Sequence, residues 1–231
     1  DALADGVAGL AAHTRLVVVH GGGPEIAQWQ ERVGLQPHFV EGLRVTDKAS
    51  LELAEMVLSG AVNKRLTARL VQRGVRAIGL SGVDGGLLRA TLMRHPHGDL
   101  GRVGEIRSVD VELLTMLLAQ GLLPVISPIS LGEDGHALNV NADHAALVIG
   151  GALAVDEAIF LTNVPGVLQD GAVLPNLGAA HARELIESGV ISGGMIPKVR
   201  SALAAVERGI AAVRITDLAG LAAGQGTVIT G

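Results

Sequence analysis

Residues 16–26, LVVVHGGGPEI, encode a strand, a glycine turn and the start of a helix. The apolar run 16–19 is mostly β-branched, which is typical of a strand buried on both faces of a parallel sheet. Three glycines follow His20, and Pro24 suits the first position of a helix because its missing N–H is not needed there. Such a turn lets backbone N–H groups approach an anion, and the helix N-terminus adds partial positive charge. An ordinary strand–helix turn fits equally well, because three consecutive glycines form no dinucleotide-binding fingerprint.

The composition favours a large aliphatic core and argues against disorder, since 48% of the residues are hydrophobic and 18% are charged. The only aromatic residues are Trp29, Phe39 and Phe160, which argues against a base-stacking surface for nucleic acid. A net charge of −5 gives no basic footprint for nucleic acid either. The absence of cysteine excludes disulfide and thiol chemistry and agrees with a reducing cytoplasm. We find no signal peptide and no apolar run long enough to span a bilayer.

Strand-like and helix-like segments alternate along the chain. Strands are expected at 16–19, 75–80, 122–126, 158–161, 211–215 and 227–229, and helices at 2–12, 25–33, 61–73, 179–187 and 195–208. Three more helices are expected: one capped by Asp47, with an apolar face at 51–58 and a break at Gly60, one capped by Asp110 and ending at 120, and one opened by Asn141 or Asp143 and ending at about 153. Residues 87–107 are expected to form antiparallel strands around the loop 95–98, and 133–135 and 170–171 to form hairpin turns. The alternation predicts an α/β fold with a mainly parallel sheet and helices on both faces. Because the first helix feeds a buried strand, we expect another strand to precede residue 1.

Four loops are expected after parallel strands, at residues 21–23, 81–86, 127–130 and 162–166. Ligands bind at the carboxyl ends of such strands. Because three of these loops contain glycine, the pattern suggests a polyanionic ligand, most simply a nucleotide.

Several polar residues stand out from this frame. Arg44, in a loop with apolar neighbours, is a candidate fork for a carboxylate, with a surface or capping arginine as the alternative. Asn139 and Asn141 stand at alternate positions and face the same way if the segment is extended. Asp143 lies near a helix start, where a carboxylate is stabilised. Helix capping is the alternative for these three residues, but it explains only one of them well.

Lys198 is expected in the first turns of a helix, where a cation opposes the helix dipole. A broken local rule of this kind hints at function, although a solvated lysine fits equally well. The eight histidines show no spacing typical of metal ligands.

Seven segments together resemble the amino-acid kinase family, and most closely its members that phosphorylate N-acetyl-L-glutamate. They occur in order over nearly the whole chain: VVVHGGGPEI (17–26), GLRVTD (42–47), EMVLSGAVNK (55–64), GLSGVDGG (79–86), LNVNAD (138–143), LTNVPGVL (161–168) and GVISGGMIPKV (189–199). The resemblance implies a three-layer αβα sandwich with a mainly parallel sheet, the carbamate kinase-like fold. It implies an acyl-amino-acid-binding lobe over residues 1–153, whose first strand we expect to be missing, and a nucleotide-binding lobe over 154–231, in a single compact domain.

The activity implied by the resemblance is phosphoryl transfer from ATP, with Mg²⁺, to the side-chain carboxylate of N-acetyl-L-glutamate in arginine biosynthesis. A carboxylate is already ionised at neutral pH, so no general base is required. The reaction requires in-line positioning and neutralisation of charge on the transferring phosphoryl group. The resemblance also implies a homodimer, while composition and charge predict a cytoplasmic protein without a nucleic-acid or membrane partner.

The family's residue roles carry over to matching positions. Gly22 and Gly23 are expected to contact the substrate, Asn139 to bind it, and Arg44 to hold its α-carboxylate. Asp143 is expected to orient the catalytic lysines, and Lys198 to stabilise the transition state. The nucleotide site is expected to be lined by Asn163, Val164, Pro165, Gly166, Val167, Leu168, Val190, Ile191, Ser192, Gly193, Gly194 and Met195.

The chain departs from the family pattern in three places. Family members carry a second catalytic lysine, followed by a glycine pair, on the strand that we expect before residue 1. They commonly have Asp where Asn163 stands, a change that keeps a hydrogen bond and removes a charge. The tail after Ile215 is short, so we expect no strong feedback by arginine.

Two other functions compete with this one. A kinase for carrier-protein-linked aminoadipate or glutamate in lysine biosynthesis differs around the arginine loop and the NVNAD segment. An acidic carrier would also require a positive docking patch, which a net charge of −5 does not favour. A nucleotide-binding regulator without catalysis has less need of both Asp143 and Lys198.

Overall fold

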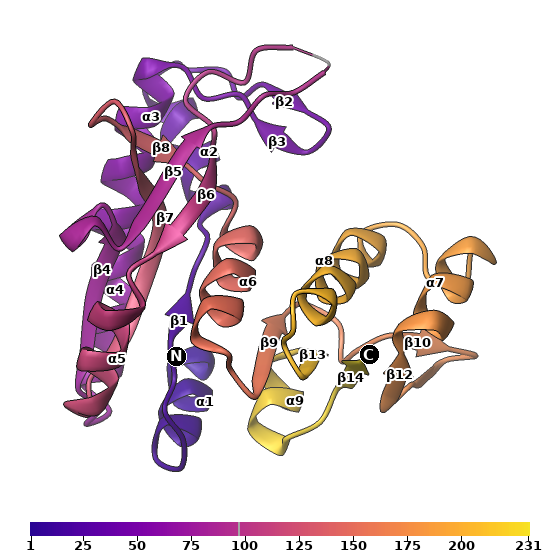
Figure 1. The fold of residues 1–231 in the computed structure, drawn as a ribbon. Coiled ribbons are helices and arrows are strands. Elements are labelled where there is room, and N and C mark those ends of the chain that lie inside the picture. The colour runs from indigo at the N-terminus through magenta and orange to yellow at the C-terminus, as the bar shows by residue number, and fades with distance from the viewer. Residues whose placement is uncertain (97) are drawn as a thin grey trace. The chain divides into compact units, whose positions relative to one another are not determined.

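The computed structural model describes residues 1–96 and 98–231, which form two compact units (Figure 1). The N-terminal unit comprises residues 11–145, and the C-terminal unit comprises residues 1–10 and 146–231. The helix α6 (Ala142–Leu153) runs across the boundary between them in the chain. Each unit has its own main sheet and its own helices, and within the described residues five of the eight strand pairings in these two sheets are parallel. The α/β class and the mainly parallel sheet predicted from the alternation of elements are confirmed.

The sheet of the N-terminal unit is built around one long strand, β7. Its strands are β1 (Val18–Val19), β4 (Ala77–Gly82), β5 (Leu88–Leu92), β6 (Gly104–Val109), β7 (Leu123–Gly132) and β8 (Ala137–Asn139). β1, β4 and β5 pair with β7 in parallel, and β8 pairs with it antiparallel across the predicted hairpin turn. β5 and β6 form the expected antiparallel pair, and His97, in the loop expected between them, lies outside the described residues.

The loop predicted at 127–130 is wrong, because these residues lie inside β7. Ser127 pairs with Ser81, but the next pair is Ser130 with Gly82, so Pro128 and the residue after it have no partner on β4. Proline has no N–H to donate and fits a strand only where the ladder is interrupted. The local signal for a loop therefore marks an irregularity within a buried strand. The segment predicted as the loop 81–86 also begins inside β4.

The helices of this unit begin largely where the sequence predicts. They are α2 (Gly23–Arg32), α3 (Lys48–Glu55), η1 (Met56–Val62), α4 (Asn63–Val71) and α5 (Val111–Ala119). The Asp47 carboxylate accepts a hydrogen bond from the Ser50 N–H at 2.7 Å and so caps α3. The Asp110 carboxylate accepts one from the Leu113 N–H at 2.9 Å and caps α5, as predicted.

The break predicted at Gly60 is wrong. α3, η1 and α4 follow one another without interruption, and η1 is a π-helical segment that contains Gly60. A π turn is wider than an α turn, so the glycine is absorbed within the helix and does not end it. Beyond η1, α4 packs against β4 and β7 and brings Asn63, which is fully buried, against the sheet.

The C-terminal unit has a four-stranded sheet in the order β12-β14-β13-β9. Its elements are α1 (Ala2–Ala11), β9 (Glu157–Leu161), β10 (Leu168–Gln169), β11 (Ala172–Val173), β12 (Asn176–Gly178), α7 (Ala179–Glu187), α8 (Met195–Glu207), β13 (Ala212–Thr216), α9 (Leu218–Ala223) and β14 (Thr227–Thr230). Val199 and Leu203 of α8 and Val213, Ile215 and Ile229 of the sheet lie in its aliphatic core. β10 and β11 confirm the predicted hairpin, whereas β12 and α9 were not predicted. Within the described residues, every helix is too short or too polar to cross a membrane.

We expect Gly79→Ala to destabilise the N-terminal unit. A Cβ at Gly79 would run into Asn63 Oδ1 and lie 2.6 Å from Thr67 Oγ1, so α4 would have to move away from β4. Overpacking of this kind costs about 1–3 kcal/mol, which urea denaturation would measure. Gly9→Ala is the matched control, because an added Cβ there meets nothing within 4 Å in α1 and alanine favours a helix. Equal stability of the two variants would contradict the tight contact.

Candidate functional site

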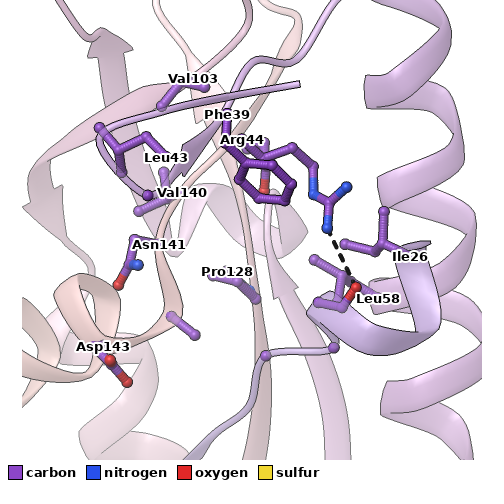
Figure 2. A pocket seen from close by; sticks show the side chains of 16 residues that line it. Ile26, Phe39, Leu43, Arg44, Leu58, Val103, Pro128, Val140, Asn141 and Asp143 are labelled. Atoms are coloured by element: carbon purple, nitrogen blue, oxygen red, sulfur yellow. Dashed lines mark hydrogen bonds between the residues drawn. The ribbon is translucent and has the colours of Figure 1, made fainter. Parts of the chain in front are cut away.

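A cavity of about 250 Å³ lies in the N-terminal unit and is lined by three segments distant in the sequence. They are the glycine turn 21–23 after β1, the hairpin of β2 (Phe39–Val40) and β3 (Leu43–Arg44), and residues 139–143 between β8 and α6. Figure 2 shows side chains from the hairpin and from the 139–143 segment around this cavity, with Pro128 of β7 among its lining residues. The expected glycine turn, Arg44 and the NVNAD segment therefore converge on one site.

The glycine turn is held tightly at Gly22 and is open at Gly23. A Cβ at Gly22 would lie 2.7 Å from Leu58 Cδ2, whereas one at Gly23 would meet nothing within 4 Å. Gly22 is the N-cap of α2, and Pro24 stands in its first turn, as predicted. The N–H groups at the start of a helix have no intrahelical acceptor and carry the positive end of the helix dipole. The turn thus offers backbone donors at the wall of the cavity, where an anion would be stabilised.

Arg44 is fixed by contacts on several sides. Its Nη1 donates to Gln30 Oε1, and its Nη2 donates to the Gly23 carbonyl oxygen at 3.3 Å, the bond drawn in Figure 2. The guanidinium carbon lies 4.7 Å from the centre of the Phe39 ring. Partial burial lowers the pKa of Arg44 from its ordinary value, and an arginine remains charged despite such a shift. A held, charged guanidinium that still has N–H groups to offer is suited to bind a carboxylate.

Gln30 holds the Arg44 guanidinium in place, and no local sequence signal points to this role. It lies on α2, is 1% exposed, and its Nε2 donates to Ser50 Oγ at 3.4 Å. A buried amide can accept from Arg44 only while its other end is satisfied, and Ser50 on α3 satisfies it. The orientation of the arginine therefore depends on the packing of α2 against α3.

The asparagines of the 139–143 segment have different partners. Asn139, at the end of β8, donates from Nδ2 to Thr46 Oγ1 at 3.1 Å. Asn141 accepts from the N–H of His144 at 3.0 Å and so caps α6, which was the alternative considered for one of these residues. Asp143 lies in the first turn of α6 and lines the cavity, where Figure 2 shows its carboxylate.

The β7–β8 hairpin carries Asn139 and is held by an arginine fork, which is the bidentate ion pair of Arg102 with Asp134. Arg102 Nη1 and Nη2 donate to the two carboxylate oxygens of Asp134 at 2.6 and 3.1 Å, and Nη2 also donates to the Ala137 carbonyl oxygen at 3.0 Å. The carbonyl oxygen of Arg102 accepts from the N–H of Asn139 at 2.9 Å. The Arg102 guanidinium and the N–H of His136 hold the pKa of Asp134 well below its usual range. This fork fixes the strand that brings Asn139 to the cavity.

The other predicted residues belong to the C-terminal unit. Lys198 lies in the opening turns of α8, whose N-cap is Gly194, and residues 190–194 precede that helix. Residues 163–167 follow β9, where the N–H of Val167 donates to Thr227 Oγ1 at 2.8 Å. A Cβ at Gly166 would lie 2.6 Å from the same oxygen, so this loop runs close to β14.

Predicted residues thus fall into two groups. Gly22, Gly23, Arg44, Asn139 and Asp143 line one cavity of the N-terminal unit, whereas Lys198 and the residues expected to bind a nucleotide lie in the C-terminal unit. Within residues 1–96 and 98–231, no three His, Asp or Glu side chains form a group able to hold a metal ion.

The comparisons with known proteins agree on one family. The model of the amino acid kinase family matches residues 1–217. The acetylglutamate kinase of Chloroflexus aurantiacus is 57% identical over 207 residues, which covers 89% of this chain and 82% of that protein. The crystal structure of smu.665 from Streptococcus mutans UA159 is 32% identical with a TM-score of 0.84, covering 98% of this chain and 91% of the other. Carbamate kinase from Giardia lamblia shares the fold, with a TM-score of 0.71 at 15% identity. The match covers 98% of this chain and 88% of the carbamate kinase chain.

Replacing Asp134 by Asn should remove a pH-dependent contribution to stability. Because the folded state lowers the pKa of this carboxyl group, its contribution is present above the unfolded value of about 3.9 and is lost as the pH falls below it. The difference in free energy of unfolding between the chain and Asp134→Asn should therefore be constant near neutral pH and shrink under acidic conditions. Urea titrations from pH 7 downwards would measure it, with Glu133→Gln as the control in the same turn. A difference that does not depend on pH would contradict the role of the fork.

Proposed function

The chain belongs to the amino acid kinase family, and on that premise we propose that it phosphorylates the side-chain carboxylate of N-acetyl-L-glutamate with ATP. The names of its relatives support this choice, since curated relatives at 45–57% identity are acetylglutamate kinases. The observation that carries the proposal is the cavity that combines a fixed guanidinium, Arg44, with the backbone donors of the glycine turn. The reaction would belong to arginine biosynthesis.

The substrate offers a charge for each end of this cavity. N-acetyl-L-glutamate has an α-carboxylate, which we assign to Arg44, and a side-chain carboxylate, which we assign to the glycine turn at Gly22 and Gly23. We assign Asn139 to a polar contact with the part of the substrate that lies between its two carboxylates. Its link to Thr46 and the Arg102 fork would keep it in place.

The reacting groups need no general base. The side-chain carboxylate is ionised at neutral pH, and one of its oxygens attacks the γ-phosphorus of ATP as the bond to the bridging oxygen of ADP breaks. The products are an acyl phosphate and ADP. The chain contributes positioning and positive potential, from the backbone N–H groups of the glycine turn and from Lys198, and Asp143 is assigned to orient the lysine.

The two units suggest a division of roles. We assign the acyl-amino-acid substrate to the N-terminal unit and ATP to the C-terminal unit, whose segments 163–168 and 190–195 contain the residues named above for the nucleotide.

Mg²⁺ usually keeps several waters and binds through phosphates with few protein ligands. We therefore propose that Mg²⁺ enters with ATP. The homodimer and the cytoplasmic location also stay predictions.

The kinase for a carrier-linked substrate is not favoured, because the compared relatives that match most of the chain share the name acetylglutamate kinase. A non-catalytic regulator would form no product.

The proposal is tested by trapping the acyl phosphate with hydroxylamine. With the full-length protein, Mg²⁺ and ATP, we expect hydroxamate from N-acetyl-L-glutamate, and none from L-glutamate or free aminoadipate. The free α-amino group of these two compounds adds a positive charge that an acetylated substrate lacks. Absence of product from all three compounds would overturn the proposed activity, and product from L-glutamate alone would overturn the proposed substrate.

Arg44→Ala should mainly raise the KM for N-acetyl-L-glutamate. Loss of a charge-assisted hydrogen-bond pair costs about 1.5–3 kcal/mol, which corresponds to an increase of about tenfold to 150-fold. The KM for ATP should change little, because the substitution removes binding of the other substrate. Arg65→Ala is the matched control, since Arg65 lies outside the cavity and pairs with Glu25 at 3.1 Å. A change confined to the KM for ATP would contradict the assignment.

A further inference from the structure

We propose that Asn63 and His20 are positioning residues that fix the peptide between Gly21 and Gly22 and so direct the Gly22 N–H as a donor for the reaction. The kinetic part of this inference rests on the proposed function, whereas its structural part does not. Neither residue lines the cavity. Both act through the glycine turn, which does.

The amide of Asn63 can be oriented in only one way. Its Nδ2 lies 2.9 Å from the Val125 carbonyl oxygen and 3.2 Å from the Leu80 carbonyl oxygen. If the amide were turned round, its oxygen would face two carbonyl oxygens, which cannot donate. Asn63 thus joins β7 to β4 through its NH₂ group, and that group also lies 3.1 Å from His20 Nε2.

This orientation of the Asn63 amide leaves its oxygen without a hydrogen bond among the described residues. Asn63 is fully buried, and its Oδ1 has no hydrogen-bond partner within the described part of the chain. A buried acceptor without a partner is unfavourable, so its presence calls for an explanation. The benefit that we infer is control of the neighbouring imidazole.

Asn63 fixes the protonation of His20. The NH₂ group has two N–H groups for three acceptors, so one N–H is shared between His20 Nε2 and a carbonyl oxygen. Because the amide nitrogen cannot accept a hydrogen bond, Nε2 must be the acceptor and carries no proton. His20 Nδ1 lies 2.9 Å from the Gly21 carbonyl oxygen, which can only accept, so Nδ1 must carry the proton. Burial lowers the pKa of His20, against a smaller opposing effect of Glu25 and the carbonyl, which agrees with a neutral ring.

The bond from His20 fixes the direction of a donor in the turn. In a trans peptide the C=O and the following N–H point in opposite directions. The Gly21 carbonyl points to the His20 ring, so the Gly22 N–H points away from that ring. Gly22 lines the cavity, and Leu58 and Val62 pack where its side chain would be, which hinders rotation of the peptide. A preoriented N–H needs no reorganisation as charge develops on the transferring phosphoryl group.

Two substitutions of His20 separate the donor from the acceptor. Asn at this position places an amide N–H near the site of Nδ1 and has no group at Nε2, whereas Gln places its amide near Nε2 and has none at Nδ1. We expect His20→Asn to retain most of the kcat and His20→Gln to lower it by about tenfold or more, since loss of a single donor of this kind costs up to about 1,000-fold. The KM for ATP should stay unchanged in both, and His13→Gln, at an exposed histidine outside the cavity, is the control.

A purely structural role would give a different result. It would lower the melting temperature and the kcat together in both variants, without the difference between Asn and Gln. Equal kcat values for His20→Asn and His20→Gln would therefore overturn the proposal, whether both were low or both unchanged.

The ring nitrogens of His20 give a test that does not need turnover. In the ¹⁵N-labelled full chain at neutral pH, we expect the chemical shifts of a protonated Nδ1 and an unprotonated Nε2, and a change in the Nε2 chemical shift in Asn63→Ala, which removes the donor to that nitrogen. The amide signal of Gly22 should move in His20→Gln more than in His20→Asn. A proton on Nε2 in the unsubstituted chain would overturn the inference. If instead no hydroxamate forms while these shifts are observed, the proposed function fails and the structural inference stands.

Discussion

The N-terminal unit depends on the hydrogen-bonding capacity of one buried strand. A strand has two edges, yet β7 pairs with four neighbours, so each edge must serve two of them in succession. β1 and β8 share one edge, at residues 125–126 and 129–131. β4 and β5 share the other edge, at residues 123–130 and 131–132. The change of partners falls near Pro128, where a missing N–H does least harm.

The candidate site lies where these partners change. β1 ends there and releases the glycine turn, β8 arrives there with Asn139, and Pro128 itself lines the cavity. A strand that changes partners leaves a gap between the ends of its neighbours, which a ligand can enter without breaking a ladder. Asn63 joins the two strands just before the change, through the carbonyl groups of Leu80 and Val125. The rigidity of the turn and the openness of the cavity therefore have a common origin.

Local chemistry predicted much of this, because helix starts and hairpin turns depend on a few adjacent residues. The caps Asp47 and Asp110 and the turn before α2 follow from such signals. Arg44 could be singled out in a loop with apolar neighbours, and Asn139 and Asp143 in a polar segment between a hairpin and a helix start. Gln30 could not, because its role arises only when α2 packs on α3 and its burial has no mark in the sequence. The continuation of β7 through residues 127–130 was not predicted, because a proline close to two serines is a local signal for a loop. Here the local signal misleads, and the pairing of β7 with its neighbours decides the structure.

The π-helical segment η1 has a consequence for how this helix can vary. One residue more per turn shifts the angular phase of all that follows by about 100°. α3 faces α2 and β8 before the shift, and α4 faces β4 and β7 after it. The two α-helical halves thus have the same period but differ in phase, and a deletion of a single residue between 56 and 62 would bring them into phase. Such a deletion would leave a regular helix and rotate Asn63 away from the strands, so length in this segment is constrained more than composition.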